Sequence, residues 1–306
     1  MREAAYDWQS VSASNTTIFL RCLLKTIRLA TGPTEAASVL RLFFKLLVWR
    51  LRGSSNAEQD ETLRLHGVTH VLGLGTGELL TPQEIYWEGG YDRLPDFVPR
   101  AGWIVVDVGA NAGVYAVQQA QRGARVYAVE PNPDCYRRLQ KSVRANDVEG
   151  RVLAVNCALG ATAGSAELLV PGGLTTMGSL RPLWTPTASR GGVKVKVETL
   201  DEVVRNFGIH RIDLLKVDVE GLELDVLHGA HYAIELVNRL VVEYHSLDLG
   251  GRVVDLLAER GFTIVLDEKM YRGEESMYQG VGRGLLFAKR RIGSAAPGSG
   301  TGAAVA

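Results

Sequence analysis

Short apolar strands alternate with helical segments from Ile104 onward, and this alternation constrains the fold more than any other feature of the sequence. Strands are predicted at Ile104–Val108, Arg125–Val129, Val152–Val155, Ile212–Val219, Leu240–Tyr244, Phe262–Leu266 and Gly284–Lys289. Helices are predicted between most of them, at Val114–Arg122, Pro133–Asn146, Leu222–Tyr232 and Arg252–Arg260. Apolar strands that alternate with helices are typical of a mostly parallel sheet covered on both faces. The sequence therefore predicts a doubly wound α/β fold.

Residues 161–199 interrupt this alternation. Two strand-like pieces, AELLV and VKVKVETL, flank a loop rich in Gly, Thr, Ser and Pro. This pattern predicts an inserted β-hairpin. The low-complexity tail, residues 292–306, is expected to be disordered. We therefore assign residues 61–291 to the α/β domain, with the hairpin inside it.

Residues 1–60 are predicted to form a basic helical arm and a linker. Between Arg21 and Arg52 there are seven basic residues and one acid, Glu35, and the basic residues fall in narrow stripes on two helices. Charges interrupt the second helix before the roughly 18 to 20 apolar residues that a membrane-spanning helix needs. Two interpretations of residues 16–52 stay open: an arm packed on the domain or on a second copy, and a peripheral helix on anionic lipid.

The segment between arm and sheet, RGSSNAEQDE at positions 52–61, is typical of an exposed linker. Two short strands are expected after it, at Val68–Gly73 and Glu78–Leu80.

Charge and cysteine content exclude several classes of partner and site. Lys plus Arg and Asp plus Glu both number 34, so no global field favours nucleic acid. The three cysteines show no CxxC spacing, which favours a reducing compartment over a disulfide framework or a zinc site. With no signal-peptide pattern in the sequence, we expect a cytoplasmic protein, with peripheral attachment to the inner face of the membrane as the alternative.

The stretch VVDVGANAGVYAV, at positions 105–117, predicts a nucleotide-binding turn between the first strand of the sheet and a helix. Gly109 permits a sharp turn, and Gly113 permits close packing at the start of the helix. A dinucleotide turn of the form GxGxxG would need glycine where this chain has Asn111 and Val114, which argues against a pyrophosphate. Asp107 can instead face a cationic or amino-bearing ligand.

A second polar residue, Glu130, ends the next strand and precedes Pro131-Asn132-Pro133. A carboxylate at this place can accept both hydroxyls of a ribose. The structural alternative is a neighbour of a helix N-cap, since Pro133 suits the first turn of a helix.

Four segments, VVDVGANAGVYAV, AVEPNP, TLDEVV and DLLKVDVEGLELDVLHGA, resemble the FkbM family of S-adenosylmethionine-dependent methyltransferases, over residues 84–290. The resemblance implies a seven-stranded sheet with its last strand antiparallel, and methyl transfer to a hydroxyl oxygen. It also implies that the cofactor lies at the carboxyl ends of the first strands. On this basis the cofactor-binding residues are Asp107 and Gly109 (methionine and sulfonium side), Asn111 and Gly113 (loop shape), Glu130 (ribose), and Asn156, Cys157 and Ala158 (adenine).

The strand end LLKVDVEG, at positions 214–221, is expected to supply the reacting centre. Alternation along a strand puts Lys216, Asp218 and Glu220 on one side, and charges on a central strand are costly unless they serve a ligand crevice. Asp218 is the first candidate, either as the group that accepts the acceptor's proton or as a ligand of Mg²⁺. A structural charge network or a helix cap stays open for Asp218 and Glu220, and no dedicated metal-ligand set is predicted.

The next strand ends in VVEYH, which places Glu243 and His245 on one face. His245 is a candidate general base with a pKa near the working range, or else a surface residue. His228 and His231 are expected to be structural.

These features predict an O-methyltransferase that acts on a hydroxyl of a sugar, a glycolipid or a secondary metabolite. The alternatives are an NAD-dependent oxidoreductase and a non-catalytic, membrane-associated adaptor. The hairpin is expected to be a lid or an acceptor wall, in which Thr175, Thr176 and Ser179 hydrogen-bond a polyhydroxyl acceptor or simply form a loop.

Overall fold

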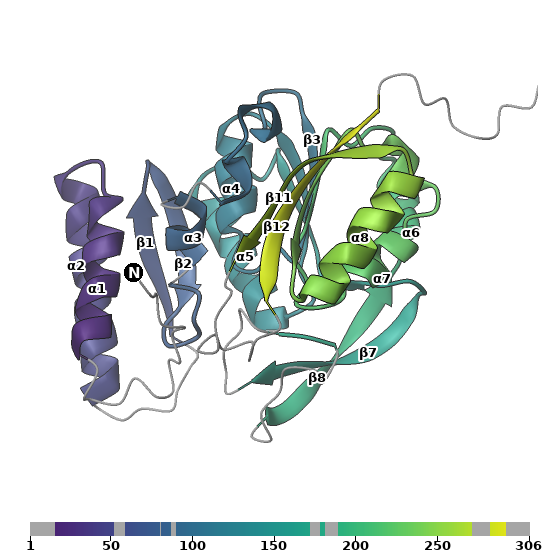
Figure 1. Ribbon diagram of the computed structural model, residues 1–306. Helices are drawn as coiled ribbons and strands as arrows, with labels where there is room; N and C mark the ends of the chain where they lie inside the picture. Colours follow the sequence, from purple (N-terminus) through teal and green to yellow (C-terminus); the bar gives the residue numbers. More distant parts are fainter. Residues whose placement is uncertain are drawn as a thin grey trace, which may run out of the picture.

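A seven-stranded sheet forms the centre of the protein, whose computed structural model describes residues 16–51, 59–79, 81–86, 90–171, 178–180, 189–270 and 282–291. The strand order is β5-β4-β3-β9-β10-β12-β11 (Figure 1). In chain order the strands are β3 (Ile104–Val108), β4 (Arg125–Val129), β5 (Val152–Val155), β9 (Leu214–Val217), β10 (Arg239–Tyr244), β11 (Phe262–Met270) and β12 (Arg283–Arg290). Strand β12 runs antiparallel to both neighbours, whereas β3, β4, β5, β9 and β10 pair in parallel. The predicted fold class and its reversed last strand are confirmed.

Helices cover both faces of this sheet (Figure 1). One face carries α4 (Val114–Gln121) and α5 (Pro133–Ala145), and the other carries α6 (Leu200–Asn206), α7 (Glu223–His228) and α8 (Leu247–Glu259). Successive side chains of a strand point to opposite faces, so Val105 belongs to the first core and Val106 to the second. Both are fully buried. The continuous apolar runs in the sequence are therefore the mark of strands buried on both sides.

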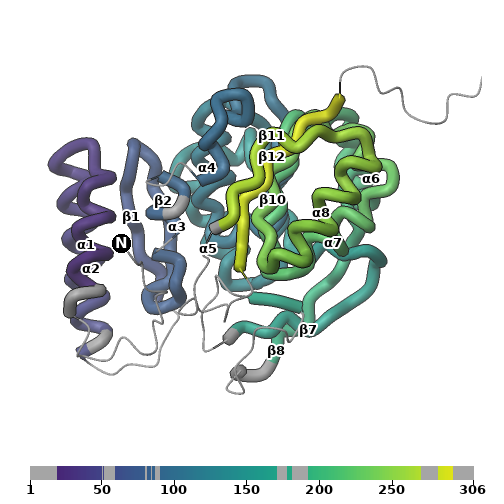
Figure 2. The backbone as a smooth tube through the Cα atoms, viewed as in Figure 1, coloured from purple at the N-terminus to yellow at the C-terminus, as the bar shows by residue number. Residues whose placement is uncertain are grey.

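The N-terminal arm packs on the protein's own domain. Its helices are α1 (Thr16–Arg28) and α2 (Pro33–Leu51), which pack on each other, and α2 lies against β1 (Asp60–Leu65) (Figure 2). Strand β1 pairs antiparallel with β2 (Val68–Gly73), which in turn contacts α4 and α5. Leu42 and Leu46 of α2 are buried in this contact, and Lys45 forms an ion pair of 2.7 Å with Glu61 of β1. The inner face of the arm thus fits the interpretation of an arm packed on the domain. The opposite face of α2 exposes an apolar stripe made of Leu40, Phe44, Leu47 and Leu51.

Three short elements connect β2 to the sheet: α3 (Thr81–Tyr86) and the 3-10 turns η1 (Gly90–Asp92) and η2 (Pro95–Phe97). Phe97 packs edge-on against Phe287 of β12, with the ring centroids 5.2 Å apart. This contact fixes η1 and η2 against the face of the sheet that also carries α4.

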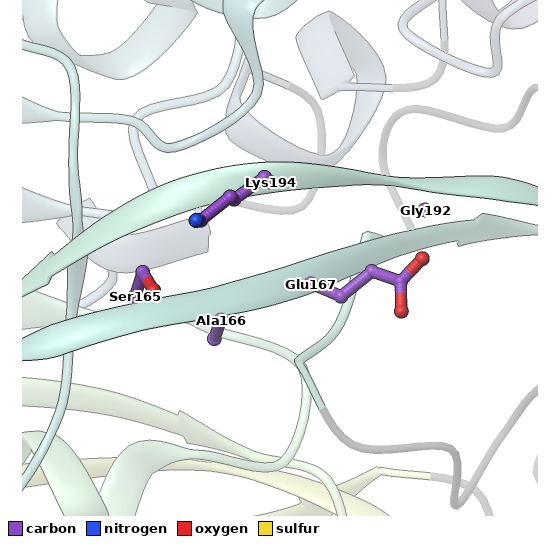
Figure 3. Close-up of a pocket in the computed structure, with 5 residues that line it drawn as sticks. All are labelled: Ser165, Ala166, Glu167, Gly192 and Lys194. Atoms are coloured by element: carbon purple, nitrogen blue, oxygen red, sulfur yellow. The ribbon is translucent and has the colours of Figure 1, made fainter.

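The inserted hairpin is present as a separate small sheet (Figure 1). Strands β7 (Gly164–Pro171) and β8 (Ser189–Glu198) pair antiparallel, and the short β6 (Ala158–Leu159) joins β8 in parallel. Thr175 and Thr176 lie outside the described residues. The hairpin carries a hollow of about 350 Å³. Figure 3 draws the five residues that line it: Ser165, Ala166, Glu167, Gly192 and Lys194.

Two predictions about the segment before the sheet are wrong. Glu78 and Leu79, the described part of the expected strand Glu78–Leu80, lie in a turn, because the Glu78 side chain is buried in an ion pair of 2.6 Å with Arg138. The expected linker 52–61 extends too far, because Asp60 is already the first residue of β1. Residues 52–58 lie outside the described part of the chain.

Several element bounds differ from the prediction for local reasons. Helix α8 begins at Leu247, five residues before the expected start, because the Ser246 hydroxyl caps it by accepting the Leu249 N–H at 3.1 Å. Helix α7 ends at His228, and the 3-10 turn η5 (Ala233–Leu236) follows. Strand β9 is shorter than the predicted Ile212–Val219, which changes how Glu220 reaches the site.

Gly109 holds the carboxyl ends of β3 and β9 close together. Its φ is +79°, and a Cβ at this position would lie 1.8 Å from the carbonyl oxygen of Asp218. From the sequence, the glycine at this position is attributed to a turn and a ligand close to the backbone. The structure gives a second reason for a glycine here, which is the close approach of the chain after β9.

A matched pair of glycine substitutions tests this packing. Gly102 has a φ of +82° with nothing within 4 Å of an added Cβ, so Gly102→Ala carries only the cost of the left-handed backbone, about 1–2 kcal/mol. We expect Gly109→Ala to lower the free energy of unfolding by about 1–3 kcal/mol more, because it adds a clash with backbone. Urea unfolding measures both, and equal losses would contradict the account.

Candidate active site

The carboxyl ends of β3, β4, β9 and β10 bring the predicted polar residues to one edge of the sheet. In parallel sheets this edge is the usual place of ligand binding. The turn after β3 contains three left-handed residues: Gly109 at φ +79°, Asn111 at +51° and Gly113 at +83°. A Cβ on Gly113 would lie 2.3 Å from the Leu139 side chain, so this glycine serves the packing of α4 against α5.

Glu130 joins this turn to the end of β4. One carboxylate oxygen accepts the N–H of Asn111 and the other accepts the N–H of Asn132, both at 2.8 Å. Asn132 is the N-cap of α5, so Glu130 is also a neighbour of a helix N-cap, as the structural alternative expects. Burial raises the pKa of Glu130 to about 7, although the two backbone N–H groups oppose this. A buried carboxylate at this strand end suits the hydroxyls of a ribose, and that role stays a prediction.

Residues 156–158 lie next to Glu130, as expected for one wall of the same site. The Asn156 amide donates to the carbonyl of Glu130 at 2.8 Å and to that of Pro131 at 3.1 Å, which fixes the loop after β4. Cys157 and Ala158 are buried. Burial raises the pKa of the Cys157 thiol to about 12, which fits a small apolar wall and not a nucleophile. A contact of these residues with adenine stays a prediction.

Asp107 is fully buried and faces a cation of the chain itself. Its carboxylate lies 2.9 Å from the ammonium of Lys216, which also donates to the carbonyl of Gly109 at 3.0 Å. Burial lowers the pKa of Lys216, but Asp107 and Asp218 outweigh it, and the net shift is upward. Lys216 is therefore a charged link between β3 and β9, and a direct contact of Asp107 with a cationic ligand stays a prediction.

Asp218, Glu220 and His245 form a cluster whose ligand-type atoms all lie within 4.8 Å of one another. The imidazole Nε2 lies 3.8 Å from Asp218 Oδ1 and 3.5 Å from Glu220 Oε2. The sequence predicts that strand alternation places Glu220 in the cluster. This explanation is wrong, because β9 ends at Val217. Glu220 reaches the cluster through a left-handed backbone, with φ at +52°. Such strain in a residue other than glycine is typical of functional sites.

His245 is positioned by a carboxylate that the sequence did not single out. Its Nδ1 lies 2.7 Å from Glu223 Oε1, and both side chains are buried. Burial lowers the pKa of His245, but Glu220 and Glu223 outweigh it and hold the pKa well above its usual range. The predicted pKa near the working range is thus wrong. In this state His245 is an imidazolium, which cannot accept a proton.

Tyr91 is a further site residue that sequence reasoning missed. Its hydroxyl lies 2.8 Å from Asp218 Oδ2 and 3.1 Å from Glu243 Oε2, and the Lys216 ammonium lies 4.9 Å from the centre of its ring. Tyr91 belongs to the turn η1, 127 residues away from Asp218 in sequence. No local pattern marks it, and only the packing of η1 on the sheet brings it here.

The edge carries more negative than positive charge among the described residues. Lys216 offsets Asp107, Arg283 offsets Glu243 through an ion pair of 2.9 Å, and His245 offsets one further carboxylate. Each carboxylate of this group lies near a basic group, but five carboxylates share three basic groups, which leaves an excess of two negative charges when all are ionised. The groups counted are Asp107, Asp218, Glu220, Glu223, Glu243, Lys216, Arg283 and His245. Burial raises the pKa of Glu220 to about 8, in spite of the opposing effect of His245.

Ser179 ties the hairpin to this edge. Its hydroxyl donates to the carbonyl of Glu220 at 2.8 Å, and the residue is buried. Its described role is thus to support Glu220. An acceptor contact by Ser179, Thr175 or Thr176 stays a prediction, as does the function of the hairpin as lid or wall.

The sheet order, the glycine turn after β3 and the acidic residue after β4 define a nucleotide-binding α/β protein of the class I methyltransferase type. The model of the Methyltransferase FkbM domain matches residues 107–264. The chain belongs to this family. It is a methyltransferase with S-adenosylmethionine as its cofactor, and the interpretation as an NAD-dependent oxidoreductase or a non-catalytic adaptor is set aside.

Curated relatives agree with the family. The methyltransferase sdnD of Sordaria araneosa is 35% identical over 219 residues, which is 60% of this chain and 82% of the relative. The hexuronic acid methyltransferase AglP of Haloferax volcanii is 31% identical, over 51% of this chain and 62% of the relative. The 31-O-demethyl-FK506 methyltransferase FkbM of Streptomyces tacrolimicus is 30% identical, over 70% and 94%.

Solved structures resemble the chain only distantly. TYW2 of M. jannaschii in complex with AdoMet has 15% identity and a TM-score of 0.45, with 78% of this chain and 90% of that chain covered. TrmK of M. capricolum in complex with S-adenosylhomocysteine has 10% identity and a TM-score of 0.40, with 64% and 65% covered.

The described residues fit the cofactor in charge and hydrogen-bonding capacity. The surplus of carboxylates at the ends of β9 and β10 suits a sulfonium, and Glu130 suits a ribose. These two features lie on either side of the turn Gly109–Gly113, because Glu130 accepts the Asn111 N–H while Gly109 meets the Asp218 carbonyl.

Cofactor binding is predicted to depend on pH through Glu130. The ionised carboxylate is the better hydrogen-bond acceptor for ribose hydroxyls. With its pKa raised to about 7, Glu130 gains this charge as the pH rises from 6 to 8, so the Kd for S-adenosylmethionine should fall over this interval. Calorimetric titration of wild type and Glu130→Gln measures the effect. The variant should bind more weakly and without this pH dependence, and a pH-independent Kd in wild type would contradict the assignment.

Proposed function

We propose that this chain transfers a methyl group from S-adenosylmethionine to a hydroxyl oxygen of a sugar, a glycolipid or a secondary metabolite. The observation that carries the proposal is the cluster of Asp218, Glu220 and His245 beside the cofactor turn. Two relatives support the acceptor class by their names, since one is a hexuronic acid methyltransferase and the other acts on 31-O-demethyl-FK506. Nucleic acid is not among the proposed acceptors, because the net charge is zero.

The bound cofactor supplies an electrophilic methyl carbon, and its sulfur keeps the electron pair of the broken carbon–sulfur bond. The residues of the chain have to orient the acceptor, take its proton and exclude water. As the acceptor oxygen bonds to the methyl carbon, its hydroxyl proton passes to a carboxylate of the cluster and then to solvent. The products are a methyl ether, S-adenosylhomocysteine and a proton.

Asp218 is the residue best placed for this proton. Its side chain keeps 24% of its surface exposed, against 1% for His245, so an acceptor in the crevice can reach it. The Tyr91 hydroxyl lies against Oδ2, which fixes the carboxylate with Oδ1 toward His245. His245, already protonated, serves to hold the two carboxylates in place and not as the base.

An Asp218→Asn substitution is predicted to remove transfer but keep cofactor binding. The amide keeps the shape of the carboxylate and cannot take a proton, so we expect methyl transfer to fall about 100-fold or more. The matched control is Asp255→Asn, on the exposed face of α8, which should behave like wild type. Incorporation of tritiated methyl into a panel of hexuronic acids, glycolipids and hydroxylated natural products measures transfer. Undiminished transfer by Asp218→Asn, or no binding of S-adenosylmethionine by wild type, would refute the proposal.

A lipid contact through residues 16–52 would bring the site close to a glycolipid or membrane-bound acceptor. Within the described residues, no helix combines the length and the apolar character that crossing a membrane requires. Because the inner face of α2 is buried on β1, the surface available for a lipid contact is the stripe Leu40, Phe44, Leu47 and Leu51. Basic residues of α1, such as Arg21 and Arg28, are exposed and suit anionic headgroups. Flotation with anionic vesicles that is the same for wild type and Phe44→Glu would rule this contact out.

A further inference from the structure

The ends of β9 and β10 hold three potential metal ligands in a mutual arrangement that is more specific than a surface cluster of acids. Asp218 and Glu220 contribute carboxylates, and His245 contributes an imidazole that is 1% exposed. The distances of 3.5 and 3.8 Å from Nε2 to the two carboxylates exceed those of hydrogen bonds. Both distances fall instead between those of ligand atoms around one octahedral cation. Around such a cation, neighbouring ligand atoms lie roughly 3 Å apart and opposite ones roughly 4.2 Å apart.

Each of the three ligands is oriented by a second group. Glu223 holds Nδ1 of His245 at 2.7 Å, which directs Nε2 toward the carboxylates. The Tyr91 hydroxyl fixes Asp218 through Oδ2 at 2.8 Å, and Ser179 holds the left-handed backbone of Glu220 through its carbonyl. A carboxylate on the outer nitrogen of a histidine is the usual support of a metal-ligating imidazole.

The charge of the edge points the same way. Among the described residues there, five carboxylates share three basic groups, and a sulfonium carries a single positive charge. A divalent cation held between Asp218 and Glu220 would offset the surplus at the place where the ligand atoms converge. Oxygen ligands with one imidazole suit Mg²⁺ and Mn²⁺.

We propose that Asp218, Glu220 and His245 bind one divalent cation of the Mg²⁺ or Mn²⁺ type, with Glu223 as the group that positions His245. The Nε2 proton of His245 leaves to solvent as the cation binds, because a metal-ligating imidazole is neutral. The role of this cation in catalysis rests on the proposed function, whereas its binding does not. A cation at this place would hold the acceptor by its hydroxyl oxygen and lower the pKa of that hydroxyl. With the cation bound, Asp218 is a ligand and does not accept the proton itself, so the hydroxyl proton leaves directly to solvent as the oxygen–carbon bond forms and the carbon–sulfur bond breaks.

Binding of Mn²⁺ to the full chain tests the site without any acceptor. Titration followed by electron paramagnetic resonance should find one Mn²⁺ per chain, and pulsed measurements should detect the ¹⁴N coupling of one imidazole. His245→Ala should abolish the ¹⁴N coupling and weaken binding at least tenfold, and Glu223→Gln should weaken binding about 10- to 100-fold. His228→Ala, on the exposed end of α7, is the matched control and should bind as wild type does. Circular dichroism checks that each variant is folded.

Several results would overturn the inference: no bound Mn²⁺ in wild type, the same affinity in His245→Ala and His228→Ala, or no ¹⁴N coupling. Assays of methyl transfer and of cofactor binding distinguish a failure of the cation site from a failure of the proposed function. Full transfer in the presence of EDTA would reject a catalytic cation and leave methyl transfer standing. Binding of Mn²⁺ with its ¹⁴N coupling, in a chain that does not bind S-adenosylmethionine, would reject the proposed function and leave the cation site standing.

Discussion

The buried ion pair between Lys216 and Asp107 is the interaction on which the rest of the site depends. It links β9 to β3 at 2.9 Å, and the same ammonium reaches the carbonyl of Gly109 at 3.0 Å and lies 3.8 Å from Asp218. Removing one partner of such a pair leaves an uncompensated buried charge, which typically costs about 3–5 kcal/mol. The pair thus holds the turn after β3 and Asp218 in a fixed relation. Gly109, which has no side chain, makes the same approach sterically feasible.

The carboxyl ends of β3, β9 and β10, held together in this way, gather charged side chains of both signs. One lysine serves two carboxylates, Arg283 serves Glu243, and the imidazolium of His245 lies among the remaining acids. Five carboxylates share three basic groups there, and burying surplus charge is costly, so a cationic ligand would stabilise this edge. The cationic sulfonium of S-adenosylmethionine and a divalent cation would both match this surplus, and we place them side by side at this edge of the sheet.

The sequence predicted the sheet well because its strands are buried on both faces and therefore read as apolar runs. It also identified Asp218, Glu220 and His245, since polar residues at strand ends stand out against such runs. It failed where position depends on contacts distant in sequence. Tyr91 comes from a 3-10 turn without any motif, and the pKa of His245 is set by Glu220 and Glu223, whose distance to the ring no spacing rule provides. The predicted strand at Glu78–Leu80 is wrong because the Glu78 side chain forms a buried ion pair with Arg138 in a turn.

The central claim is that the turn after β3 and the acidic ends of β9 and β10 form one methyl-transfer site. A crystal structure of the chain with S-adenosylhomocysteine tests this claim most directly. The account predicts the ribose hydroxyls within hydrogen-bond distance of the Glu130 carboxylate, with the sulfur directed toward Asp218. S-adenosylhomocysteine bound away from Glu130, or with its sulfur directed away from Asp218, would contradict the account.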